Sequence, residues 1–263
     1  HCHGWGVFLD GCCQRIMEQR KVVLIGLLFS FSVAFGQNTS SSLVDIGKNF
    51  LGKPYRANML SVGNPEQFIT SKEAFDCVTF LENCLAIRNS KGVDSLYLKV
   101  LKHVRYAGDS VQYENRFHYF SDAMNAMGYP QILDEAHVSI VSKDFSFLSS
   151  YLRSKKLSSI NLGLLEDREK LLAKHPFQFT AIDNIAFLLP RIQSGDLVAF
   201  VTKNPHLDFL HTGMLVREGN SIHLLHASQD KKQVVLSSEN LGEYLKSHPK
   251  FIGICVFRPI FNE

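Results

Sequence analysis

The chain changes its hydrophobic pattern about two thirds of the way along its length. Before residue 190 apolar side chains recur every three or four positions, the spacing that places them on one face of a helix. This pattern predicts helices over residues 43–51, 77–85, 95–106, 119–127, 147–152 and 164–172. After Ser194-Gly195-Asp196, short apolar runs predict strands over residues 197–201, 212–217, 222–227, 233–236 and 252–258, with a short helix over 241–246. Helices first and strands afterwards indicate an α+β fold.

Two connections matter for the arrangement of these elements. Glu218-Gly219-Asn220 has the composition of a hairpin turn, so the strands on either side of it should pair antiparallel. Residues 56–72 have no sustained period and contain Gly63, Asn64 and Pro65, which predicts an irregular loop. No internal repeat or long linker interrupts the sequence, which favours a single domain.

The residues that carry chemistry lie at the ends of these elements. Cys77 begins a helix, where free backbone N–H groups and the helix dipole favour a thiolate. His211 precedes strand 212–217 and His226 ends the next strand, so the hairpin should bring the two imidazoles together. This placement predicts Cys77 as a nucleophile, His211 as its base and His226 as the residue that orients the base.

Nearby residues of the same types allow other interpretations. A cysteine and two histidines could bind zinc, but no close ligand pair such as Cys-x-x-Cys is present among them, so we expect no metal and no cofactor. Cys84 lies two helical turns beyond Cys77, which is typical of core packing. His223 is expected to be a solvated strand histidine. Asp208, near His211, could be a ligand, a substrate contact or a loop cap, of which the loop cap is favoured.

Composition and the ends of the chain narrow the class of protein. The 28 basic and 25 acidic residues of this 263-residue chain nearly balance, which argues against binding to nucleic acid or to an acidic membrane surface. Residues 17–36 combine a charged start, an apolar stretch and small residues before Gln37, and therefore predict a cleaved export signal. The apolar stretch is about 14 residues, short of the roughly 20 needed to span a bilayer, so no stable membrane anchor is expected.

These boundaries divide the chain into three parts. Residues 1–16 are interpreted as a mis-called upstream extension, 17–36 as the signal and 37–263 as a single catalytic domain. The predicted location is the periplasm or the exterior of the cell. Only Cys77, Cys84 and Cys255 remain in the domain after cleavage, and three cysteines do not make a disulfide framework.

Four motifs, in this order, resemble those of the NlpC-type bacterial cell-wall cysteine hydrolases: Gly52-Lys53-Pro54-Tyr55, Phe75-Asp76-Cys77, His211-Thr212-Gly213-Met214 and His226-Ala227-Ser228. The resemblance implies a papain-like α+β fold, with N-terminal helices packed on a small antiparallel sheet. It also implies a catalytic triad of Cys77, His211 and His226, with Tyr55 and the Cys77 amide at the oxyanion site.

Two departures resemble one branch of that family, the N-acetylmuramoyl-L-alanine amidase-like proteins. They are the large residues after the cysteine, Val78-Thr79-Phe80-Leu81-Glu82, and the long, largely helical insertion before His211, which contains the run from Arg116 to Asp122. The resemblance makes Arg116, His118 and Tyr119 candidates for substrate binding, and Asp76 and Asp208 are the further candidates. For the run at Arg116, aromatic side chains that fill the core remain an equal alternative.

The expected activity is hydrolysis of a peptidoglycan or muropeptide amide, with the bond between N-acetylmuramic acid and L-alanine favoured by the branch resemblance. The wider family suggests the alternative bond between D-glutamate and the diamino acid of the stem peptide. A non-catalytic cell-wall binding protein of the same fold and an acyl transferase are the remaining alternatives. A monomer without other partners is expected.

Overall fold

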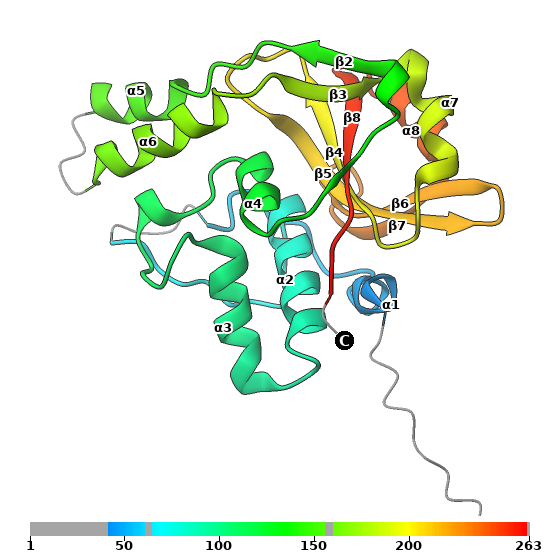
Figure 1. The fold of residues 1–263 in the computed structure, drawn as a ribbon. Helices are drawn as coiled ribbons and strands as arrows, with labels where there is room; N and C mark the ends of the chain where they lie inside the picture. Colours follow the sequence, from blue (N-terminus) through cyan, green and yellow to red (C-terminus); the bar gives the residue numbers. More distant parts are fainter. Residues whose placement is uncertain (1–41, 61–64, 156–159, 262–263) are drawn as a thin grey trace, which may run out of the picture. The chain divides into compact units, whose positions relative to one another are not determined.

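The strands of the described chain form one eight-stranded antiparallel sheet (Figure 1). The structure is a computed structural model and describes residues 42–60, 65–155 and 160–261. The strand order is β2-β3-β8-β4-β5-β6-β7, and β1 pairs with β8 beside this path. The strands are β1 Gln131–Ile132, β2 Val138–Val141, β3 Phe177–Ala181, β4 Leu197–Thr202, β5 Phe209–Glu218, β6 Ser221–Ser228, β7 Gln233–Asn240 and β8 Phe251–Phe257.

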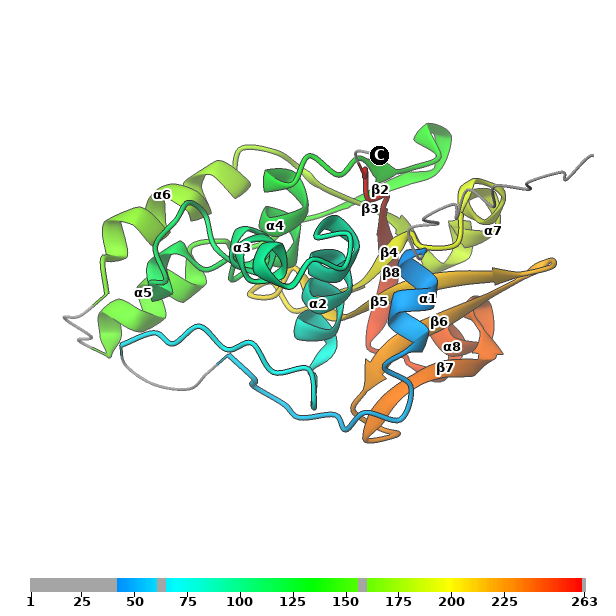
Figure 2. The same cartoon turned by 90° about the horizontal axis from the view of Figure 1, so that it is seen from below.

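Helices cover both faces of this sheet (Figures 1 and 2). Side chains of α1, α2 and α4 share one buried cluster with the strands, and those of α7 and α8 share a second cluster with the opposite strand face. The helices are α1 Leu43–Lys48, α2 Cys77–Asn89, α3 Asp94–Arg105, α4 Phe120–Ala126, α5 Phe147–Ser154, α6 Leu162–Leu172, α7 Ile185–Leu188 and α8 Leu241–Ser247. Single 3₁₀ turns lie at Tyr113–Asn115, Glu135–His137, Ile182–Asn184 and Leu189–Arg191.

The predicted signal and upstream extension lie outside the described residues. Every described residue belongs to one compact unit. In residues 42–60, 65–155 and 160–261, no helix has both the length and the apolar character needed to cross a membrane.

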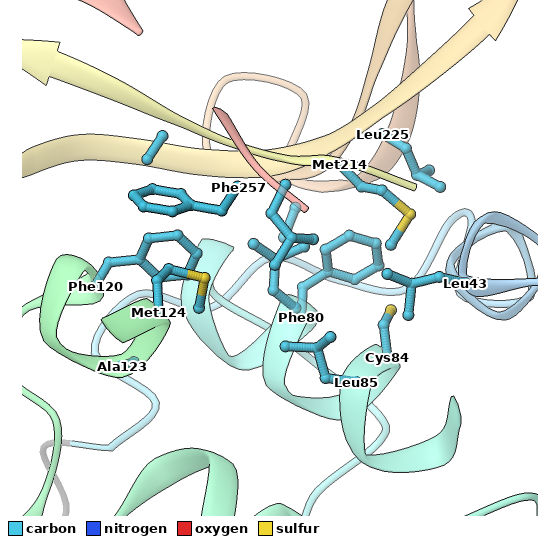
Figure 3. Packing of buried hydrophobic residues seen from close by; sticks show 14 of the residues in the cluster. Leu43, Phe80, Cys84, Leu85, Phe120, Ala123, Met124, Met214, Leu225 and Phe257 are labelled. Carbon is cyan, nitrogen blue, oxygen red and sulfur yellow. The ribbon is translucent and has the colours of Figure 1, made fainter. Parts of the chain in front are cut away.

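Helix α2 is the central helix of the core. It begins at Cys77 because the Asp76 side chain accepts a hydrogen bond from the Thr79 N–H at 2.8 Å and thereby caps the first turn. Its middle turns are buried all round, and the polar side chains among them have partners: Glu82 pairs with Arg105, and Asn83 accepts a hydrogen bond from the Tyr97 hydroxyl. Figure 3 shows Phe80 pointing toward Met214 of the sheet, and Phe80 is fully buried.

The core assignment of Cys84 is confirmed. Its side chain is fully buried in the cluster of α2 (Figure 3), and burial raises the pKa of its thiol. Gly219 has a positive φ of 59°, as expected for the turn between β5 and β6, where Glu218 pairs with Ser221.

The segment between Cys77 and His211 contributes strands as well as the predicted helices. Strands β1, β2 and β3 all come from it, and β3 pairs with β8 only through Thr180 and Ala181. The description of this segment as largely helical was therefore incomplete. Short strands whose partner lies far along the chain give no local hairpin signal, so the pattern of the sequence alone did not reveal them.

A buried ion pair joins α2 to α3. Arg105 lies 2.8 Å from the Glu82 carboxylate, and its side chain is 1% exposed. The same guanidinium donates a hydrogen bond to the carbonyl of Ile69, in the loop before α2. Arg105 therefore links two core helices to the loop that leads to Cys77.

Removing this arginine should destabilise the fold strongly. Arg105→Met leaves the Glu82 carboxylate buried without its partner, and we expect the free energy of unfolding in urea to fall by about 3–5 kcal/mol. The control is Arg153→Met, which removes an ion pair between Arg153 and Glu166 whose arginine side chain is 64% exposed. That variant should lose less than about 1 kcal/mol. Equal losses in the two variants would contradict the central role of the buried pair.

Candidate active site

Strand β5 packs directly against the start of the helix that carries Cys77. The Thr212 hydroxyl donates a hydrogen bond to the Cys77 carbonyl at 3.2 Å. Because Thr212 follows His211 in the chain, this contact places the histidine on the segment that adjoins the thiol. The structure thus joins Thr212, the neighbour of His211, to Cys77, which lies 135 residues earlier in the sequence.

The two strand histidines form a pair. His211 Nε2 lies 2.6 Å from His226 Nδ1, and the rings meet edge to face with their centroids 4.9 Å apart. The hairpin therefore produces the proximity that the sequence predicted. Since Nε2 of His211 is engaged by His226, Nδ1 is the nitrogen that remains to act on another group.

Strand β5 contains a bulge immediately before His211. Phe200 pairs with His211 whereas Val201 pairs with Phe209, so Leu210 is an extra residue in the strand. The His211 ring stacks on its cross-strand partner Phe200 with the ring centroids 5.8 Å apart.

Gly213 allows His226 of β6 to lie close to strand β5. A Cβ at this position would lie 2.6 Å from Leu224 Cδ1 and 3.0 Å from His226 Cβ, both shorter than a normal contact. A larger residue would therefore push β6 side chains away from β5. This is the physical reason for a glycine two residues after His211.

Burial keeps both imidazoles neutral near pH 7. Desolvation lowers the pKa of His211 to about 4, and His248 nearby lowers it further. Desolvation also lowers the pKa of His226 to about 2, with the charge of His211 as the next cause. A neutral imidazole can accept a proton, so His211 has the form that a general base requires.

The thiol differs from its sequence-based expectation. The helix N-terminus was expected to favour a thiolate, but burial raises the pKa of Cys77 to about 11, and the adjacent Asp76 carboxylate acts in the same direction. Hydrogen bonding from Thr212 opposes these effects without overcoming them. The resting site therefore contains a neutral thiol and a neutral imidazole.

Tyr55 lies beside the nucleophile. It pairs with Phe75, two residues before Cys77, and its N–H donates to the Lys232 carbonyl at 2.8 Å. Burial raises the pKa of the Tyr55 hydroxyl, and Cys77 and Asp76 add to the effect through their charges. The phenol therefore stays protonated and can donate a hydrogen bond at neutral pH.

The Asp76 carboxylate accepts hydrogen bonds from backbone N–H groups around the site. Besides capping α2, its Oδ2 accepts a hydrogen bond from the Met59 N–H at 3.2 Å. It thus fixes the loop after Tyr55 to the start of the nucleophile helix. Its predicted contact with substrate would have to use a carboxylate whose two oxygens already have partners.

Arg116 is buried rather than open to a ligand. Its guanidinium lies 3.0 Å from the Glu66 carboxylate and also donates to the Leu60 carbonyl. The Tyr106 hydroxyl donates to the same carboxylate at 3.0 Å. Arg116 therefore anchors the loop between Tyr55 and Cys77.

His118 and Tyr119 also have hydrogen-bond partners within the protein. His118 Nε2 lies 2.8 Å from the Tyr113 carbonyl, and the Tyr119 hydroxyl donates to Glu169 at 2.8 Å. Burial lowers the pKa of His118 to about 3, so its ring is neutral. These contacts favour the alternative in which the side chains of this run fill the core.

Asp208 is a buried cap. Its Oδ2 accepts hydrogen bonds from the Ser121 N–H at 2.9 Å and the Ser121 hydroxyl at 3.0 Å, while Oδ1 accepts from the Phe209 N–H. These contacts join the start of β5 to the first turn of α4. They match the loop-cap alternative that the sequence left open.

Sequence reasoning missed two rings from the end of α8. The Tyr244 ring meets His226 edge to face at 5.5 Å and stacks on His248 at 4.2 Å. His248 Nε2 in turn lies 3.6 Å from the Asp230 carboxylate. No local motif marks these residues, because only the packing of α8 beside β6 brings them to the histidine pair.

The described residues hold no group of three or more histidine, cysteine, aspartate or glutamate side chains placed to bind a metal ion. His223, expected to be solvated, is half-buried and its Nδ1 lies 3.0 Å from the Ser237 carbonyl. It takes no part in the contact between His211 and His226.

The antiparallel sheet with helices on both faces defines a mixed α/β protein, and the paired histidines beside the Cys77 helix define its candidate active site. Residues 45–254 match the AmiA-like family, described as N-acetylmuramoyl-L-alanine amidase-like. The match covers most of the sequence, and the chain belongs to this family. Membership supports a hydrolase that acts on peptidoglycan.

Solved structures agree with this assignment. The chain is similar to an N-acetylmuramoyl-L-alanine amidase from Bacteroides uniformis ATCC 8492, with 27% identity and a TM-score of 0.73 over 85% of this chain and 99% of that one. A second crystal structure under the same name gives 28% identity with the same TM-score and coverage. A Legionella pneumophila protein shares the fold, with 19% identity and a TM-score of 0.64 over 83% of this chain and 90% of that one. No curated protein matches the sequence.

The neutral histidine pair should make the fold sensitive to acid. The pKa values of His211 and His226 lie below the ordinary value near 6.5, so below about pH 6.5 the unfolded chain binds protons that the folded chain does not. Stability should therefore fall from about pH 6.5 to pH 4, by up to about 1.4 kcal/mol per pH unit for each histidine. Urea unfolding across this range measures the slope. The double variant His211→Gln, His226→Gln should show a clearly shallower one, and an unchanged slope would contradict burial as the cause.

Gly213→Ala should separate the histidines. The added methyl group must displace Leu224 or His226, so we expect a loss of about 1–3 kcal/mol in urea unfolding. The shared His211–His226 signal in imidazole ¹⁵N spectra should also change. The control is Gly163→Ala in α6, where the nearest atom to the new Cβ would lie 3.4 Å away. That change should be neutral or stabilising, because alanine favours a helix. An intact histidine pair in Gly213→Ala would refute the steric argument.

Proposed function

We propose that the protein hydrolyses the amide bond between N-acetylmuramic acid and L-alanine with a papain-like triad of Cys77, His211 and His226. The observation that carries the proposal is the 2.6 Å contact between His211 and His226, on strands that pack against the start of the Cys77 helix. A nucleophile, a base and an orienting group are the three parts that such catalysis requires.

The resting protonation states define the first step. His211 Nδ1 removes the thiol proton as the Cys77 sulfur attacks the lactyl carbonyl carbon of the muramic acid. The thiol need not be ionised in advance, because proton transfer and attack proceed together. His226 holds the His211 ring through Nε2 and so directs Nδ1 toward the sulfur.

The tetrahedral intermediate carries a negative oxygen. The Cys77 amide at the N-terminus of α2 and the protonated Tyr55 hydroxyl are the donors proposed for it. Collapse of the intermediate breaks the C–N bond, and the proton on His211 passes to the leaving amine of L-alanine. Water, deprotonated by His211, then hydrolyses the thioester and returns the free thiol.

The choice of bond rests on similarity. The Bacteroides uniformis neighbours are named for the N-acetylmuramoyl-L-alanine bond, which favours it over the bond between D-glutamate and the diamino acid. The presence of the cysteine and both histidines favours an enzyme over a binding protein of the same fold. We further propose that the enzyme acts in the periplasm or outside the cell, after removal of residues 17–36.

The test is the product released from defined muropeptides. The wild-type protein should yield an intact stem peptide and a peptide-free sugar by mass spectrometry, and Cys77→Ala should reduce the rate by at least about 10³-fold. The control is Cys84→Ala, which removes the other cysteine of the same helix and should retain activity wherever the protein remains folded. Undiminished cleavage by Cys77→Ala would refute the nucleophile, and cleavage within the stem would refute the assigned bond.

A further inference from the structure

A cavity of about 420 Å³ opens beside the histidine base. It lies between the turn from β6 to β7 and the segment that follows α8. Its lining includes Leu210, His211, Gln229, Asp230, His248 and Lys250. The volume is within the range of about 300–1,000 Å³ that ligand sites usually have.

The chemistry at His211 determines which part of a substrate can reach this cavity. In the proposed reaction His211 gives its proton to the leaving amine, so the leaving group must lie next to the imidazole. The leaving group of muramoyl-alanine cleavage is the whole stem peptide, beginning with L-alanine. The cavity has His211 in its lining and so offers space for a peptide next to the base.

The charges in the lining suit a peptide of this kind. In the described residues, Lys250 forms no ion pair, whereas the Asp230 carboxylate lies 3.6 Å from His248. D-Glutamate in the stem is linked through its side chain, so its α-carboxylate is free and sits one residue beyond the cleaved amide. A lysine ammonium on a flexible stem can reach such a carboxylate.

We propose that this cavity is the subsite for the leaving stem peptide, and that Lys250 pairs with the free α-carboxylate of its second residue. The proposal rests on the proposed function, because the peptide lies beside His211 only when the muramoyl bond is cut. Lys250 then contributes to the choice of substrate by binding this carboxylate. Asp230 and His248, which also line the cavity, pair with each other.

Binding can be measured without catalysis. The probe is the tripeptide L-alanyl-γ-D-glutamyl-diaminopimelate, titrated calorimetrically into full-length Cys77→Ala protein. Adding Lys250→Met should weaken its binding about three- to fivefold, the size expected for a partly solvated ion pair. The same tripeptide with the glutamyl α-carboxylate amidated should bind more weakly and be insensitive to Lys250→Met. The control is Lys246→Met on α8, an exposed lysine that does not line the cavity.

The outcomes separate this proposal from the proposed function. Equal affinity in the Lys250→Met and Lys246→Met proteins, or no preference for the free carboxylate, overturns the subsite even if the wild-type enzyme cuts the muramoyl bond. If the wild-type enzyme cuts elsewhere, the function fails. A selective loss of tripeptide binding in Lys250→Met then still supports the cavity as a peptide site.

Discussion

The packing of helix α2 against strands β5 and β6 is the constraint on which the rest of the site depends. Cys77 is the first residue of that helix, and the hydrogen bond from Thr212 fixes its carbonyl to β5. The same packing buries Phe80 against the sheet face opposite the one that α8 covers. A site built from a helix end and two strands is rigid because moving either histidine would disturb the core.

Burial also sets the chemistry of the site. Burial raises the pKa of Cys77 to about 11 and lowers that of His211 to about 4. The proton donor and the proton acceptor are therefore both neutral before the transfer. A preformed ion pair would require the site to solvate two charges, and a largely dry site does not favour this. Charge therefore develops only during attack, where the helix N-terminus and Tyr55 can stabilise it.

Much of this arrangement could be predicted from the sequence, because its signals are local. The cap at Asp76, the turn at Gly219 and the alternation around His211 and His226 are short-range patterns that the fold preserves. The burial of Arg116 could not be predicted in the same way. Its partner Glu66 lies 50 residues earlier in the chain, and only tertiary packing determines whether an arginine faces solvent or the core.

The buried arginines explain why the loop before Cys77 can be long and irregular and still form part of the site. Arg105 donates a hydrogen bond to the Ile69 carbonyl, and Arg116 forms an ion pair with Glu66. The Asp76 carboxylate accepts a hydrogen bond from the Met59 N–H. The contacts at Ile69 and Met59 satisfy backbone groups that a regular element would have paired within itself. The loop therefore begins at Tyr55 and ends at Cys77, with its course fixed by the side chains of Arg105, Arg116 and Asp76.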